Sequence, residues 1–132
     1  MESDSDAPDL ELVEFASRLF ALARAGNTDQ LTAHIDAGVP VNLCDDAGDT
    51  LLMLAAHHGH EPTVRGLLAR SADPNCVNYR GQTPLAGAVF KDERAVVGIL
   101  VASGADPCRG QPSAVDTARM FERADYLTLF ER

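Results

Sequence analysis

Three of the four histidines lie close together in the sequence, at His57, His58 and His60. Imidazole is a common metal ligand, and such a cluster raises the question of a zinc site. Neighbouring positions on a helix point about 100° apart, however, so the first two rings diverge. No second group of ligand-type residues stands at a suitable spacing. The sequence therefore predicts no metal site and no cofactor.

The three cysteines offer a second possible chemistry. Cys44, Cys76 and Cys108 are evenly spaced, at an interval one position short of the repeat period described below, so their side chains are not expected to converge. An odd number of cysteines argues against a disulfide framework and for a reducing compartment. Binding that responds to oxidation stays open as an alternative.

The sequence gives no support for nucleophilic catalysis. It contains no Gly-x-Ser-x-Gly segment, no glycine loop that could hold phosphate, and no paired carboxylates in a predicted pocket. Asp106 and Asp116 stand at ordinary positions of the repeat described below. We therefore expect that the protein is not an enzyme.

The net charge of −9 is unevenly distributed, because residues 1–14 hold six acids and no base. This pattern predicts an acidic flexible tail at residues 1–8. An acidic chain opposes binding to nucleic acids, which requires clustered lysine and arginine. There is neither a secretory signal nor an apolar run of the length that a membrane helix needs, so we expect no membrane partner and a cytoplasmic location.

One segment returns along the chain at a constant interval and organises everything else. Residues 48–56 (GDTLLMLAA) return as residues 81–89 (GQTPLAGAV), and the same offset takes residues 72–74 to residues 105–107 (ADP in both). Self-similarity at a fixed period of this size indicates a stack of repeated units. Aromatic residues make up only 5% of the chain. Small aliphatic side chains favour closely packed helices over a sheet.

Apolar spacing and turn residues predict paired helices. Asp9 is the expected cap of a long first helix, and Thr50 and Thr83 are the expected caps of two later ones. The last helix is expected to place Leu127 and Phe130 on its inner face. The helices are expected at about residues 9–25, 28–37, 50–58, 62–70, 83–90, 93–102, 113–118 and 124–130.

The segment Gly81–Leu85 (GQTPL) with Ala88, followed by residues 100–106 (LVASGAD), resembles the ankyrin repeat. The resemblance extends over most of the chain. It implies an all-α ankyrin-repeat solenoid of about four helix-turn-helix units whose outer two are degenerate caps, and members of this family generally bind proteins on a concave surface. The domain would cover residues 9–132, with units at about 9–44, 45–77, 78–109 and 110–132.

Three departures from the ankyrin pattern are expected to weaken local turns slightly. Leu51 replaces the usual proline, Ser71 replaces the usual glycine, and Asp92-Glu93 replace the usual Gly-His. His60 occupies that histidine position in the second unit, where the ring usually forms a hydrogen bond to the backbone of a turn.

Candidate partner-binding residues lie at the loop tips and on the solvent side of each first helix, where no packing role is expected. Exposed aromatic residues and arginine are typical interface anchors. For Phe90, packing against the following helix or against Tyr79 is the alternative. The acidic tip is either a solvated turn or a dock for a basic segment. The complete set is Asp45, Asp46, Asp49, Met53, His57, His58, Tyr79, Arg80, Gln82, Ala86, Phe90 and Lys91.

These features lead us to expect a monomeric, non-enzymatic module that binds a protein partner, as an adaptor or an inhibitor. Stacked helices would hold the binding surface in place, so little ordering entropy would be lost on binding. The alternative is a structural subunit that supports a neighbouring enzyme, for example in stress or redox metabolism. Metal- or redox-responsive binding through the histidines and cysteines is the third hypothesis.

Overall fold

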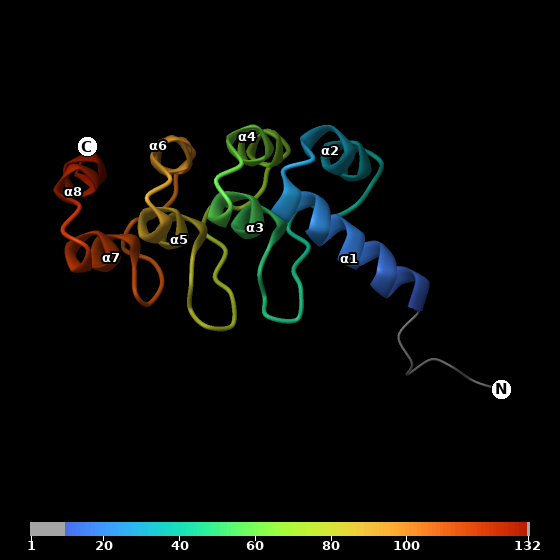
Figure 1. Cartoon of the computed structure of the whole chain (residues 1–132), viewed down its shortest axis with the longest axis horizontal. Helices are drawn as coiled ribbons and strands as arrows, with labels where there is room; N and C mark the ends of the chain where they lie inside the picture. Colours follow the sequence, from blue (N-terminus) through green and yellow to red (C-terminus); the bar gives the residue numbers. More distant parts are fainter. Residues whose placement is uncertain (1–9, 132) are drawn as a thin grey trace.

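The chain forms an open stack of helix pairs arranged in two rows (Figure 1). The structure is a computed structural model that describes residues 10–131. The predicted tail and the predicted cap Asp9 lie outside these residues. The predicted all-α repeat architecture is confirmed. The first row holds α1 (Leu10–Ala25), α3 (Leu51–His57), α5 (Pro84–Lys91) and α7 (Ala114–Met120), and the second holds α2 (Thr28–Asp36), α4 (Glu61–Ala69), α6 (Arg94–Ala102) and α8 (Ala124–Phe130).

Hydroxyl caps start the first helix of three units. The side-chain oxygens of Thr50, Thr83 and Ser113 each accept a hydrogen bond, at 3.1 Å, from the backbone N–H three residues later. Such a cap satisfies one of the N–H groups that a helix leaves without a partner at its start. The predicted threonine caps are therefore confirmed, and the fourth unit uses serine for the same purpose.

The core runs between the two rows and consists of small aliphatic side chains. Leu52 and Leu85 fill it in the central units, while Ala55 and Ala88 are completely buried where α3 packs against α5. An alanine at such a contact lets two helices approach closely. This packing fixes the first-row helices relative to one another and so determines the shape of the surface they present.

A long loop precedes each of α3, α5 and α7 and projects from the first row (Figure 1). We call these loops fingers: finger 1 is residues 39–50, finger 2 is 72–83 and finger 3 is 105–113. Tyr79 donates its backbone N–H to Ala47 across fingers 1 and 2 at 3.0 Å, and Gln111 donates to Gly81 across fingers 2 and 3 at 2.9 Å. The fingers therefore form a connected layer.

The outer helices cover the core to different extents. In the first half of α1, Leu10 and Val13 are exposed. The reason is that α1 has 16 residues and its neighbour α3 has 7, so the start of α1 extends beyond the stack. In α8, Tyr126 is buried, and Leu127 and Phe130 are partly buried and pack against the core, as expected.

The turn between the two helices of each unit meets a side chain from the next unit. A Cβ atom at Gly26 would lie 2.6 Å from the ring of His60, and one at Gly59 would lie 2.6 Å from the carboxylate of Glu93. Both glycines have positive φ. His60 also donates Nε2–H to the carbonyl of Arg24 at 2.6 Å, which confirms the hydrogen bond expected of this histidine. Glycine is needed at these turns for its backbone conformation and for the space it leaves.

The third turn replaces glycine with Asp92, which adopts a left-handed conformation with φ 58°. Its carboxylate accepts a hydrogen bond from the Tyr126 hydroxyl at 2.6 Å and forms an ion pair with Arg123 at 3.1 Å. Arg94 lies over the Tyr126 ring and pairs with Asp125. These contacts join the third unit to the fourth and offset the backbone strain that the departure from glycine introduces.

This network predicts sensitivity to acid. The hydrogen bond from Tyr126, with Arg94 and Arg123 nearby, holds the pKa of Asp92 below its ordinary value of 3.8. A carboxylate whose pKa is lower in the folded state stabilises that state above the unfolded pKa and loses the effect as pH falls through the folded pKa. We therefore expect the melting temperature to fall below about pH 4, more steeply for the wild type than for Asp92→Asn.

Circular dichroism melts across this pH range test the prediction. Asp29→Asn is the matched control, because it removes a carboxylate from the exposed first turn of α2. It should leave the steepness of the acid transition unchanged. Equal acid sensitivity in the wild type and Asp92→Asn would contradict the assignment.

Candidate functional site

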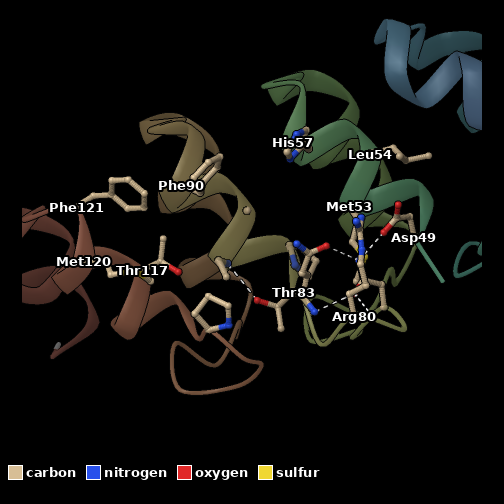
Figure 2. A pocket seen from close by; sticks show the side chains of 16 residues that line it. Asp49, Met53, Leu54, His57, Arg80, Thr83, Phe90, Thr117, Met120 and Phe121 are labelled. Atoms are coloured by element: carbon tan, nitrogen blue, oxygen red, sulfur yellow. Dashed lines mark hydrogen bonds between the residues drawn. The ribbon is translucent and has the colours of Figure 1, made fainter. Parts of the chain in front are cut away.

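A groove with a volume of about 470 Å³ crosses the first-row helices of the second, third and fourth units. Figure 2 shows that its walls come from α3, α5 and α7 and from the ends of the fingers that precede them. Since these helices are fixed by the core beneath them, the groove exists without a partner. It is large enough to accept several side chains.

Seven of the predicted binding residues line this groove, and they come from the second and third units. The structure brings together Asp49, Met53, His57, Arg80, Gln82, Ala86 and Phe90. Five others lie outside the lining, at finger tips or at helix ends: Asp45, Asp46, His58, Tyr79 and Lys91.

Two positions expected to face solvent without a packing role are buried. Met53 is 7% exposed and Ala86 is 6% exposed. Both lie on the floor of the groove, where α3 and α5 pack closely enough to cover them. The expectation about their exposure was wrong because helical spacing gives the direction of a side chain and not the distance to the next helix.

The aromatic residues of the third unit differ in their surroundings. Phe90 is 53% exposed, and its ring makes an edge-to-face contact with Phe121 at a centroid distance of 5.3 Å. Packing against the next unit and exposure to the groove, the two alternatives for this residue, therefore occur together. Tyr79 is 76% exposed and lies against Gly48, outside the groove.

The fourth unit contributes residues that were not among the candidates. Met120 is 63% exposed and Phe121 is 46% exposed, and both line the groove with Phe90 (Figure 2). A signal was present in the sequence. The shortened offset that relates Ser113 to Thr83 also relates Met120 to Phe90.

Asn78 holds the polar end of the groove and was also missed. Its amide Oδ1 accepts the backbone N–H groups of Arg80 and Gln82 at 3.0 and 2.9 Å. Its Nδ2 donates to Asp49 at 2.7 Å and to the Gln82 side chain at 2.8 Å. One buried side chain thus shapes finger 2 and joins it to the start of α3.

Asp45 plays the corresponding part in finger 1, one repeat earlier. Its carboxylate accepts the backbone N–H groups of Ala47 and Asp49 at 3.0 and 2.9 Å. Asp and Asn commonly hold turns in this way. The repeat period together with this preference is the signal that could have identified Asn78 as the equivalent residue.

Three histidines, His57, His58 and His60, lie next to one another at the end of α3 and in the turn that follows it. Ring centroids of His57 and His58 lie 5.6 Å apart, and those of His58 and His60 lie 6.2 Å apart. Burial, with the two neighbouring rings, lowers the pKa of His58. Within residues 10–131, no group of three or more His, Cys, Asp or Glu side chains is arranged to hold a metal ion.

The cysteines are free thiols in the described part of the chain. Burial, followed by the charge of Asp73, raises the pKa of Cys76. The charge of Cys44 contributes in the same direction. A raised pKa lowers the thiolate fraction at neutral pH, which disfavours a reactive thiol.

No helix in residues 10–131 has the length and apolarity needed to cross a membrane.

Comparison with known proteins identifies a family and several relatives. Residues 19–111 match the family described as ankyrin repeats (3 copies). An ankyrin repeat protein of Pseudomonas aeruginosa is 49% identical over 48% of this chain and 38% of its own length. An ankyrin repeat-containing protein of Treponema pallidum is 36% identical over 67% of this chain and 30% of its own length. A third, from Rickettsia bellii, is 33% identical over 61% of this chain and 45% of its own length. The chain thus spans less than half the length of each of these relatives.

Proposed function

Because the chain belongs to the ankyrin-repeat family, whose repeats generally mediate protein–protein interactions, we propose that it is a non-enzymatic domain that binds a protein partner in the groove. The observation that carries the proposal is the set of three exposed apolar side chains that line it, Phe90, Met120 and Phe121. Large apolar side chains at the surface of a rigid scaffold are typical of protein interfaces.

The packing of these side chains supports tight binding. Phe90 and Phe121 brace each other edge to face, so each ring has less freedom to lose when a partner arrives. Arg80 lies on the polar side of the groove and can donate hydrogen bonds to a partner's carbonyl or carboxylate groups. An apolar centre with a polar edge is the usual composition of a binding interface.

Peptide selection tests the proposal without knowledge of the natural partner. A random-peptide phage library is selected on the immobilised chain, and enriched peptides are then measured against the wild type and against Phe90→Ala/Met120→Ala. We expect the double variant to weaken binding by at least about tenfold, since truncated anchor residues typically cost more than about 1 kcal/mol each.

The control is Leu10→Ala/Val13→Ala, which removes a similar apolar area from exposed positions on α1. It should bind the same peptides as the wild type. Both double variants should retain the wild-type melting temperature. Selected peptides that bind equally to the wild type and to Phe90→Ala/Met120→Ala would place the binding surface elsewhere.

A further inference from the structure

The groove has two chemically different ends. Where the third and fourth units meet, Phe90, Met120 and Phe121 form an apolar end. At the second unit, Asp49 lines the groove and Asp46 is exposed on the same finger. A partner that fills the whole groove therefore meets apolar side chains at one end and the Asp49 carboxylate at the other, with Asp46 on the same finger.

The carboxylates on finger 1 differ in how many hydrogen bonds and ion pairs they form within the chain. Asp45 is used by the turn of finger 1 and lies 3.9 Å from Arg24. Within residues 10–131, neither Asp46 nor Asp49 forms an ion pair with a base of the chain. The one hydrogen bond of the Asp49 side chain in this part of the chain comes from Asn78 to Oδ1, so Oδ2 accepts none there. These two carboxylates are available to a cation from outside.

Arg80 is the arginine that lines the same groove. Its side chain forms an ion pair with neither carboxylate in the part of the chain that the structure describes. The charge of the whole chain, −9, also favours encounter with a basic partner. Local and overall charge thus agree in sign.

We propose that the groove binds a protein segment that combines apolar anchors with a lysine or arginine placed to reach Asp46 and Asp49. This inference rests on the proposed function. Packed helices lie ~8–10 Å apart and α7 is two helices away from α3, so roughly 16–20 Å separate the apolar end from Asp49. An extended segment covers this distance in about five to six residues. A helical segment covers it in about three to four turns.

Two fluorescein-labelled peptides test the charge requirement. Both carry Phe-Leu and a Gly-Ser spacer of about five residues, and one ends in Lys-Arg while the other ends in Glu-Glu. We expect fluorescence anisotropy to give a Kd at least about tenfold lower for the basic peptide. Asp46→Asn/Asp49→Asn should weaken the basic peptide about three- to tenfold and should not weaken the acidic one.

Asparagine at position 49 can still accept the hydrogen bond from Asn78, so the finger should keep its shape. Asp29→Asn removes one charge from α2, which lies in the second row, and as a control for charge loss away from the groove it should leave both affinities unchanged. Raising the salt concentration should weaken the basic peptide on the wild type and have little effect on the double variant.

Equal binding of the two peptides, no binding of the basic peptide, or no effect of the double variant would overturn this proposal. The proposed function would survive each of these results if phage-selected peptides still depend on Phe90 and Met120. Loss of that dependence would contradict the proposed function itself. The two failures are therefore distinguishable.

Discussion

Alanine in place of Leu85 should lower the free energy of unfolding by about 3–5 kcal/mol. Leu85 is buried at the centre of the stack, where α5 packs against both α3 and α7. Removing its side-chain atoms loses their burial and leaves a cavity that neighbours fixed in helices fill only in part. In a linear array the central interfaces connect the two halves, so this site is where a cavity should have the largest effect.

Urea denaturation followed by far-ultraviolet circular dichroism measures the change. Leu10→Ala is the matched control, because it removes the same atoms from a side chain that is 73% exposed. We expect it to change the unfolding free energy by less than about 0.5 kcal/mol. The transition of Leu85→Ala should also broaden as the two halves unfold less cooperatively. A loss of under about 1 kcal/mol would mean that the centre of the stack repacks freely.

Asn78→Ala should have the second largest effect, about 2–4 kcal/mol. The substitution leaves the backbone N–H groups of Arg80 and Gln82 without their acceptor and removes both donors to neighbouring side chains. Unsatisfied polar groups away from water are costly. Finger 2 should also loosen, so peptides that bind the groove should bind the variant more weakly.

Gln82→Ala separates these effects. It removes one partner of the Asn78 amide but keeps the backbone hydrogen bonds that shape the finger. We expect a loss below about 1 kcal/mol and near-normal peptide binding. If both variants lose the same stability, the shape of the finger does not depend on the Asn78 acceptor, and the role assigned to this residue is wrong.

The fold was predictable because its determinants are local and repeated. Thr50 and Thr83 mark helix starts through their own side chains, and the constant repeat interval copies each local signal along the chain. The small residues Ala55 and Ala88 similarly indicated that neighbouring helices pack closely. A pattern that needs only neighbouring residues can be recognised without knowledge of the tertiary structure.

The groove was only partly predictable, because it depends on contacts between units. Helical spacing placed Met53 on the correct face but could not show that α5 covers it. The shorter third finger shifts the register of the fourth unit, which hid the equivalence of Met120 to Phe90. The roles of Asp92 and Tyr126 depend on a pairing between residues from different units. Such pairs depend on tertiary packing, so local sequence patterns do not predict them.

The side chains that meet at the turns differ from one pair of units to the next, and this difference restricts which unit can be duplicated in tandem. A second copy of the second unit would set a new His60 equivalent against Gly59, which repeats a contact already present. A second copy of the third unit would instead set a carboxylate, the Glu93 equivalent, against Asp92 in place of the basic Arg123. Tandem duplication is thus tolerated at one junction and opposed by charge repulsion at the next, which gives the order of the repeats a chemical cause.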